Sequence, residues 1–268
     1  MQAVINDLRQ RVAQTGYIAD QELLTSLWLM TELDRPLLLE GDAGVGKTEI
    51  GKILATVLDR PLIRLQCYEG LDVNTAVYEW NYQRQLLAIR RQETHSDESV
   101  SETELFSDTY LLKRPLLQSI SEEQPAVLII DEIDRADEEF EAYLLELLSD
   151  YQVSIPELGT IKARSIPSVI LTSNGTRELS DALRRRCLYH YIDYPDYDKE
   201  LRIVMSKVPD VGAQLASQVV GFVQMLRKED LRKMPGVAET LDWTAALLRL
   251  GMQTLGDNPE AVVATLGC

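Results

Sequence analysis

The sequence contains few of the residues from which zinc sites and disulfide frameworks are built. Among its 268 residues there are 2 histidines and 3 cysteines. His95 and His190 have no metal-ligand neighbour, and the cysteines Cys67, Cys187 and Cys268 lack paired spacing. These absences argue against a zinc site and against a disulfide-stabilised secreted fold. No apolar run approaches the length of a membrane span and no signal sequence opens the chain, so we expect a reduced, cytoplasmic protein.

Basic residues are also fewer than acidic residues in this chain. The chain has 27 lysines and arginines against 43 aspartates and glutamates, which gives a formal net charge of −16 at pH 7. A surface of this charge repels phosphate backbones and acidic lipids, so we predict neither nucleic-acid nor membrane partners. The sequence also lacks a Ser-His-Asp set and a dinucleotide fingerprint. Its length allows a large core and two domains.

The most informative segment that is present is residues 41–48, a complete G-x-x-x-x-G-K-[ST] loop. A short apolar segment, 35–40, precedes the loop, and 49–58 follows it with apolar residues at helical spacing. Strand, glycine loop and helix are the context that this motif requires, so a chance glycine-rich turn is a poor alternative. The loop amides and the helix N-terminus attract anions, and the motif predicts Lys47 on the β and γ phosphates and Thr48 on Mg²⁺. The segment therefore predicts binding of a nucleoside triphosphate.

A second informative segment is residues 127–132, where an apolar run ends in two carboxylates. The run is typical of a buried parallel strand whose carboxyl end faces a ligand crevice. We expect Asp131 to hold Mg²⁺ through water and Glu132 to orient and deprotonate the attacking water. A solvated acidic turn is the alternative, and it fits poorly with a wholly apolar strand. The predicted nucleotide-binding residues are Gly41, Asp42, Ala43, Gly44, Val45, Gly46, Lys47, Thr48, Glu49 and Asp131.

Two further segments carry candidate catalytic residues. Residues 168–174 have the pattern of another buried strand and end in Asn174, which could position the same water or contact the γ-phosphate, although a plain turn residue is the alternative. Residues 184–186 are three successive arginines. They are either a solvated basic patch or arginines that reach the γ-phosphate of a neighbouring subunit. The predicted catalytic residues are thus Glu132, Asn174, Arg185 and Arg186.

These segments, in this order, resemble the AAA+ ATPases, and more closely their MoxR branch. The resemblance covers nearly the whole chain and is most specific in 130–137, in 172–174, and in 185–187 followed by 192–195. It implies that Lys47 and Thr48 are the Walker A residues, Asp131 and Glu132 the Walker B residues, and Asn174 sensor 1. It also makes Arg185 and Arg186 the arginine-finger candidates, with Arg186 slightly favoured because it directly precedes Cys187.

The expected fold is α/β. We predict a three-layer αβα domain with a parallel sheet and a P-loop (AAA+) over residues 1–195, followed by a small all-helical lid over 196–268. The resemblance places a helix insert at about 73–121 and a β-hairpin at about 151–166. The last residues stop within an apolar pattern, which leaves open whether the lid is complete.

Some details of this prediction concern single residues. Within the insert, Val77 and Tyr78 have helical spacing with later apolar residues, and Glu93 to Asp108 has the composition of a mobile loop. That loop either contacts partners near the ring axis or has no role. The helix 138–148 is expected to pack Tyr143 against the sheet and to expose Glu141. Its other packing residues are Phe140, Leu144, Leu147 and Leu148, and its other solvated acids are Glu139 and Glu146.

One feature of the related proteins is missing. They usually have a sensor 2 arginine at the start of the third lid helix, which we predict from Leu241 onward. This chain has Thr240 and Asp242 at that place, and neither Arg232 nor Arg249 lies at the matching position. The role is therefore left unassigned.

The resemblance implies a remodelling ATPase of chaperone type that assembles as a ring, expected to be a hexamer, uses ATP and Mg²⁺, and acts on a client protein. The MoxR likeness also implies a partner carrying a von Willebrand factor A domain. Residues 78–82 are similar to the MoxR-type ATPases of carbon monoxide dehydrogenase maturation, which implies a client with a molybdenum–copper site. Two alternatives stay open. The chain could be a nucleotide-gated assembly module without effective turnover, or a nucleic-acid motor, which the acidic charge disfavours.

Overall fold

The computed structural model describes residues 2–93 and 102–266, and its main element is a parallel five-stranded sheet of order β2-β5-β8-β1-β9. The strands are β1 (Leu37–Glu40), β2 (Leu62–Gln66), β5 (Val127–Asp131), β8 (Ser168–Ser173) and β9 (Leu188–Tyr191). β5 pairs in parallel with β2 on one side and β8 on the other. Every residue of β5 and β8 is buried, which explains their continuous apolar sequences. The predicted α/β fold with a parallel sheet is confirmed.

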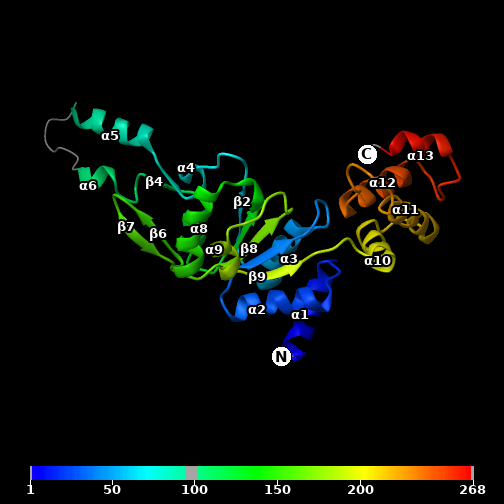
Figure 1. Ribbon diagram of the computed structural model, residues 1–268. Coiled ribbons are helices and arrows are strands. Elements are labelled where there is room, and N and C mark those ends of the chain that lie inside the picture. Colours follow the sequence, from blue (N-terminus) through cyan, green and yellow to red (C-terminus); the bar gives the residue numbers. More distant parts are fainter. Residues whose placement is uncertain (1, 94–101, 267–268) are drawn as a thin grey trace. The chain divides into compact units, whose positions relative to one another are not determined.

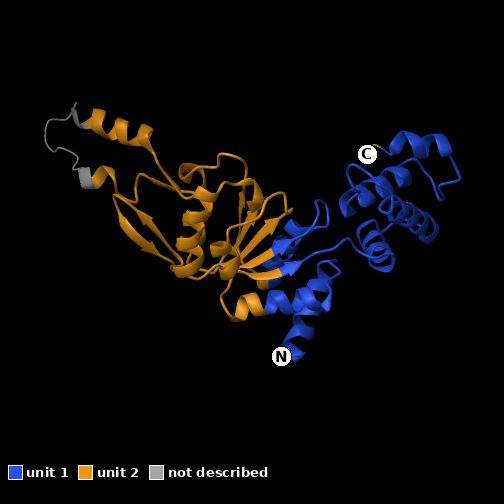
Figure 2. Ribbon diagram, viewed as in Figure 1, with its two compact units in different colours: residues 1–28, 39–57, 190–268 blue, residues 29–38, 58–189 orange. Residues whose placement is uncertain are grey.

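The chain divides into two compact units, shown in Figure 2. One unit contains residues 1–28, 39–57 and 190–268, and the other contains 29–38 and 58–189. We call the first the loop unit, because it includes the glycine loop, and the second the strand unit, because it includes β2, β5 and β8. The predicted domain boundary between residues 195 and 196 stays a prediction.

The strand unit packs helices on its buried strands. Its core includes apolar residues of β2, β5 and β8 together with those of α7 (Pro115–Ser121) and α8 (Glu138–Asp150). After β5 a 3-10 turn, η1 (Ile133–Arg135), leads into α8, and α9 (Asp181–Arg186) precedes β9. Two small sheets complete the unit: β6 (Gln152–Ile155) pairs with β7 (Gly159–Lys162), and β3 pairs with β4.

The helical spacing assigned to Tyr78 was wrong. The segment from α4 (Val73–Ala76) continues into β3 (Tyr78–Trp80), which pairs antiparallel with β4 (Leu111–Lys113). Helix α5 (Tyr82–Glu93) begins only afterwards. The pairing partner lies about thirty residues away, and Trp80 is buried against Phe106 with ring centroids 5.2 Å apart, so tertiary contacts override the local pattern. Of the predicted mobile loop, residues 94–101 lie outside the described residues, and Glu102–Leu105 forms the short helix α6.

The face assignment within α8 was wrong at two positions. Tyr143 is 54% exposed, whereas Glu141 is 1% exposed. Glu141 accepts a hydrogen bond from the Ser180 amide at 3.0 Å and forms an ion pair of 2.6 Å with Arg177. A buried carboxylate is stable here because both a cation and an amide donor compensate its desolvation.

The loop unit is helical apart from its strand ends. It contains α1 (Gln2–Gln14), most of α2 (Gln21–Glu32) and α3 (Lys47–Leu58). Its C-terminal helices have their own apolar core, to which Val204, Val220 and Trp243 contribute. They are α10 (Tyr197–Lys207), α11 (Ala213–Leu226), α12 (Val237–Arg249) and α13 (Pro259–Thr265), visible in Figure 1. Among the described residues, no helix combines the length and the apolar character needed to span a bilayer.

Helix α12 begins at Val237, four residues before the predicted start. The Glu239 carboxylate accepts the Gly236 amide at 3.1 Å and so stabilises the first turn. Leu23, Leu27 and Met30 form the buried face of α2.

Candidate nucleotide-binding and catalytic site

The glycine loop lies between β1 and α3, where its backbone takes conformations that other residues adopt poorly. Gly44 has φ +83°, in the left-handed region. A Cβ on Gly41 would lie 2.1 Å from the Ile192 carbonyl oxygen, which is itself bonded into the sheet through the neighbouring Ile192 amide on Glu40. The loop therefore needs glycine at both positions, for backbone conformation at one and for space at the other.

Lys47 is held against this loop. It is 6% exposed, and its Nζ donates to the carbonyl oxygens of Gly41 at 2.6 Å and Asp42 at 2.7 Å. Thr48 and Glu49 occupy the first turn of α3, where backbone amides and the helix dipole favour anions. The loop unit thus places a cation beside an anion-binding helix terminus, which fits the phosphates of a nucleotide.

The start of α12 is in backbone contact with the same loop. The Val237 amide donates to the Gly44 carbonyl oxygen at 2.9 Å. A Cβ on Gly236 would lie only 2.7 Å from Gly44 Cα, so glycine is needed on this side as well. The sequence analysis missed this contact. The signal was a Pro-Gly pair, Pro235 and Gly236, ahead of a helix with glutamate at its third position.

No arginine among the described residues takes the sensor 2 position at the start of α12. The Arg227 side chain, 8% exposed, instead donates to both Glu200 carboxylate oxygens, at 2.6 and 2.7 Å. Its guanidinium also lies over the Tyr194 ring, 4.7 Å from the centroid. Lys233 is the basic side chain that reaches this helix start, through an ion pair of 3.1 Å with Glu239.

The strand unit holds Asp131 at the carboxyl end of β5. The side chain is 3% exposed, and its Oδ1 accepts the Thr172 hydroxyl at 2.5 Å. Its Oδ2 accepts Arg64 Nε at 3.1 Å and also pairs with Nη2 of the same guanidinium. The Asp131 carbonyl oxygen accepts the Cys67 amide at 2.8 Å. The carboxylate is therefore fixed from the two neighbouring strands.

Glu132 follows in a left-handed conformation, φ 55° and ψ 50°, which non-glycine residues rarely adopt. Its amide donates to the Thr172 hydroxyl oxygen at 2.9 Å, so Thr172 links the two acidic residues. The Glu132 carboxylate, 31% exposed, accepts Gln66 Nε2 at 3.1 Å and Asn174 Nδ2 at 3.5 Å, and pairs with Arg135 at 3.0 Å. The structure thus brings the predicted Glu132 and Asn174 together.

Four polar partners of these carboxylates were missed by the sequence analysis: Arg64, Gln66, Arg135 and Thr172. A signal for the first two was available, since apolar and polar residues alternate over residues 63–66. Polar residues two apart on a strand share one face. The parallel register, which sets Gln66 opposite Asp131, could not be read from sequence.

Asp134 supports the turn after β5. It is 3% exposed, and its Oδ2 accepts the Thr176 amide at 3.0 Å and the Thr176 hydroxyl at 2.6 Å. Burial acts to raise the pKa of this carboxyl, but the hydrogen bonds from Thr176 outweigh it and the pKa is lowered overall. The charged form of Asp134 therefore ties η1 to the segment that follows β8.

The two arginine-finger candidates differ in their surroundings. Arg185 is 82% exposed and lies 3.9 Å from Asp181 on the same helix. Arg186 donates through Nη1 to the Ala182 carbonyl oxygen at 2.9 Å and through Nε to the Ser149 hydroxyl. Arg185 is therefore the candidate whose guanidinium extends into solvent. The adjacent Cys187 is buried, which raises the pKa of its thiol to about 12 and makes it a packed cysteine.

Each unit by itself holds a donor of the kind that suits the Mg²⁺ of a nucleoside triphosphate. The loop unit has the Thr48 hydroxyl. The strand unit has the Asp131 carboxylate, which is fixed, buried and already accepts a cationic partner, the Arg64 guanidinium. Such oxygen ligands, with phosphate oxygens and water, are those that Mg²⁺ prefers. Among the described residues no group of three or more His, Cys, Asp or Glu side chains could hold a further metal ion.

Comparison with known proteins identifies the family. Residues 36–187 match the family model "AAA domain (dynein-related subfamily)". The denitrification regulatory protein NirQ of Stutzerimonas stutzeri is 24% identical over 267 residues, covering 92% of this chain and 87% of NirQ. The gas vesicle ATPase GvpN of Haloferax mediterranei is 26% identical over 230 residues, covering 82% of this chain and 63% of GvpN.

Solved structures agree on the fold. The RuvB Holliday junction branch migration motor of Thermotoga maritima superposes with a TM-score of 0.51 at 17% identity, covering 93% of this chain and 69% of RuvB. At this identity the likeness concerns the fold alone. Because the family model spans more than half of the sequence, the chain belongs to the dynein-related subfamily of AAA domains, the subfamily of the MoxR-type ATPases.

Proposed function

We propose that the protein hydrolyses ATP and uses the energy to remodel a client protein. The observation that supports this most directly is the placement of Glu132. Its carboxylate lies at the end of a buried strand, beside the Asn174 amide and next to a fully fixed Asp131. A protein that only bound nucleotide would not need a partly exposed carboxylate held in a left-handed backbone conformation at this point.

In this proposal each residue of the site has a separate role. Lys47 and the amides of residues 41–48 bind the phosphates, and Thr48 and Asp131 hold Mg²⁺. The ion, when bound, neutralises negative charge that develops on the transferring phosphoryl group. Glu132 accepts a proton from the attacking water, and Asn174 orients the same water and the Glu132 carboxylate.

Replacing the proposed base tests hydrolysis directly. Glu132→Gln keeps the size and shape of the side chain but removes its negative charge and replaces one acceptor oxygen by an amide group. Phosphate release should fall by about 10²–10⁴-fold, while binding of a fluorescent ATP analogue stays within about twofold. Glu139→Gln, on the exposed face of α8, is the matched control and should leave both unchanged. Phosphate release that is undiminished in Glu132→Gln would refute the assignment.

We further propose that the active form is a ring, expected to be a hexamer, in which Arg185 of one subunit reaches the γ-phosphate bound by the next. Arg185→Ala should then reduce turnover by about 10³–10⁵-fold without loss of ATP binding. Arg186 is the second candidate, and its hydrogen bonds to Ser149 and Ala182 favour a positioning role. Arg184→Ala serves as the control. Full activity in both single variants and in the double variant would exclude both arginines.

The same assays separate the alternatives. A nucleotide-gated assembly module would bind ATP and assemble but release phosphate no faster in the wild type than in Glu132→Gln. A nucleic-acid motor would show turnover stimulated by DNA and a salt-dependent DNA affinity, which the charge of −16 disfavours.

The client that we propose is a metalloenzyme under maturation, with molybdenum–copper carbon monoxide dehydrogenase as the candidate and a von Willebrand factor A domain protein as the partner, in the cytoplasm. Support comes from residues 78–82 and from the likeness to NirQ, a denitrification regulatory protein. Because Trp80 of that segment is buried, part of the sequence likeness reflects packing. Capture of the client on Glu132→Gln loaded with ATP, but not on Lys47→Ala, is the test.

A further inference from the structure

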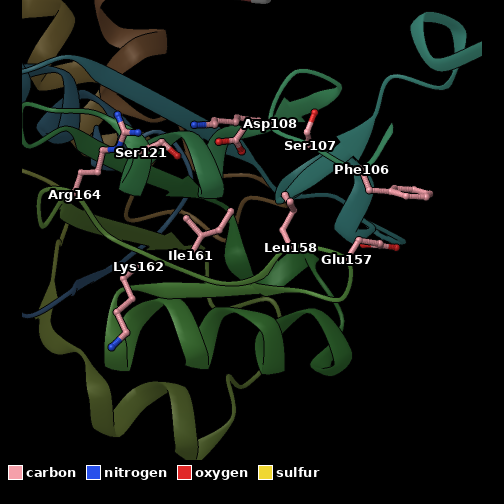
Figure 3. Close-up of a pocket in the computed structure, with 10 residues that line it drawn as sticks. Phe106, Ser107, Asp108, Ser121, Glu157, Leu158, Ile161, Lys162 and Arg164 are labelled. Atoms are coloured by element: carbon pink, nitrogen blue, oxygen red, sulfur yellow. The ribbon is translucent and has the colours of Figure 1, made fainter. Parts of the chain in front are cut away.

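The strand unit contains a cavity of about 720 Å³ that none of the predicted site residues line. We call it the hairpin pocket, because β7 and its flanking residues form one wall, while Ser121, Lys113 and residues 106–108 form the rest. Figure 3 shows Ile161 and Leu158 between its two ends, with Arg164 and Ser121 at one end and Phe106 and Glu157 at the other. Apolar side chains thus lie in the middle of the pocket and at one end, and charged side chains lie at both ends.

The charges around the pocket differ from those of the whole chain. Lys113, Lys162 and Arg164 line it, against the acids Asp108 and Glu157, in a protein of net charge −16. The three cations are exposed, and within residues 2–93 and 102–266 their side chains make no hydrogen bond or ion pair. Unpaired cations beside apolar side chains complement a ligand that carries both carboxylates and apolar groups.

The wall formed by β7 also offers free backbone groups. Among the described strands, β7 pairs with β6 alone, and the Ala163 amide donates to the Tyr151 carbonyl oxygen at 2.8 Å. In an antiparallel ladder the residues alternate between those bonded to the partner strand and those directed away from it. Thr160 and Lys162 therefore direct their N–H and C=O groups to the free edge, and no other described residue bonds them.

This free edge faces the hairpin pocket. Arg164 is the next residue in the outward series, and its amide donates to the Ile120 carbonyl oxygen at 2.8 Å, at the end of α7. The neighbouring Ser121 lines the pocket. The edge groups of Thr160 and Lys162 thus open on the side where the cavity lies, and Arg164 closes one end.

We propose that the hairpin pocket binds an extended acidic segment of a partner protein, which adds a strand to β7. The segment would pair its backbone with Thr160 and Lys162, direct carboxylates to Lys113 and Arg164, and place apolar side chains on Leu158 and Phe106. This is a binding surface and does not depend on the proposed hydrolysis, so each can fail without the other.

A defined peptide probes the surface. A fluorescein-labelled nine-residue peptide of alternating glutamate and valine should bind the full-length protein saturably, with an affinity that falls as salt rises. The same peptide with glutamine in place of glutamate, and one N-methylated at alternate residues to block strand pairing, should each bind about tenfold more weakly or not at all. No saturable binding of the acidic peptide up to about 1 mM would overturn the proposal.

Matched variants locate the binding. Lys113→Glu with Arg164→Glu should weaken the peptide at least about tenfold, whereas Arg202→Glu with Lys207→Glu, two exposed cations of α10, should change it less than twofold. Lys162→Pro removes an outward amide and should weaken binding more than Lys162→Gln, which removes only the charge. Phosphate release and the circular dichroism spectrum should stay unchanged in all four.

Other results would exclude the acidic segment. An equal loss of peptide affinity in the double variant Lys113→Glu with Arg164→Glu and in the control Arg202→Glu with Lys207→Glu would mean that the peptide binds by general electrostatic attraction. Equal affinity for the glutamine peptide would remove the role of the cations, and tighter binding of an oligothymidylate than of the peptide, lost in Lys113→Glu with Arg164→Glu, would assign the surface to nucleic acid instead.

Discussion

Like Glu141, the carboxylates of Glu200 and Asp131 are buried and paired with an arginine, and these last two pairs differ in how far the arginine is exposed. In the loop unit, Glu200 is fully buried and Arg227 is 8% exposed. In the strand unit, Asp131 is 3% exposed, but its partner Arg64 is 47% exposed. Both side chains of the Glu200–Arg227 pair are shielded from solvent, whereas in the Asp131–Arg64 pair only the carboxylate is shielded.

The other hydrogen bonds of these side chains indicate the role of each ion pair. Glu200 also accepts the Thr240 hydroxyl at 2.7 Å, and Arg227 Nε donates to the Pro235 carbonyl oxygen at 2.8 Å. The buried pair therefore fixes residues 235–240, whose Gly236 contacts the glycine loop. It is a structural clamp. Asp131, in contrast, is paired with a cation that water can reach, so the pairing can be exchanged at little energetic cost.

The largest expected effect on stability comes from removing the charge of Glu200 in the buried Glu200–Arg227 pair. Glu200→Gln leaves the Arg227 charge buried without a counter-charge, and we expect a loss of about 3–5 kcal/mol in the free energy of unfolding. Urea denaturation followed by circular dichroism measures it. Asp198→Asn, an exposed change on the same helix, should cost less than about 0.5 kcal/mol. A loss below about 1 kcal/mol for Glu200→Gln would mean that the pair is not a clamp.

The next effect concerns what the clamp holds in place. A methyl group on Gly236 would lie 2.7 Å from Gly44 Cα, so Gly236→Ala must displace the loop or the helix start, at a cost of about 1–3 kcal/mol. We expect ATP affinity to fall about tenfold, measured by titration of a fluorescent analogue. Gly221→Ala is the matched control, because its new methyl group would meet Tyr197 at an ordinary 3.9 Å. Unchanged affinity in Gly236→Ala would separate the helix start from nucleotide binding.

The smallest effect on stability is expected at the Asp131–Arg64 pair. Arg64→Ala should change the free energy of unfolding by less than about 1 kcal/mol, since the Arg64 side chain is 47% exposed to solvent. Removing this competing cation should lower the Mg²⁺ concentration needed for half-maximal nucleotide binding several-fold. Arg60→Ala, whose guanidinium bonds Ser168 at 2.9 Å, is the control and should leave the Mg²⁺ titration unchanged. A higher Mg²⁺ requirement in Arg64→Ala would show that Arg64 positions Asp131 for the ion instead.

The comparison also shows which parts of the site were accessible from sequence. The glycine loop and the acidic end of β5 were predicted because short-range constraints define them: fixed spacing, an apolar strand before and a helical pattern after. Glu141 was assigned to the exposed face, because its burial depends on Arg177 and Ser180, far along the chain. Tyr143 was assigned to the buried face, and it is 54% exposed. The strand at Tyr78 was missed for the same reason, since its pairing partner is nonlocal.

The amino-acid sequence by itself determined the family, the buried strands that lead to the glycine loop, to Asp131 and to Asn174, and the identity of Lys47, Thr48, Asp131 and Glu132 as candidates. Only the tertiary structure decided that Arg64 and Gln66 hold the two carboxylates, that Gly236 contacts the glycine loop, and that β7 presents a free edge to a basic pocket. The physical reason is the separation along the sequence over which each kind of interaction acts. Helical and strand periodicity and loop motifs act between residues a few positions apart, whereas ion pairs, backbone contacts and strand register depend on which distant segments the fold brings together.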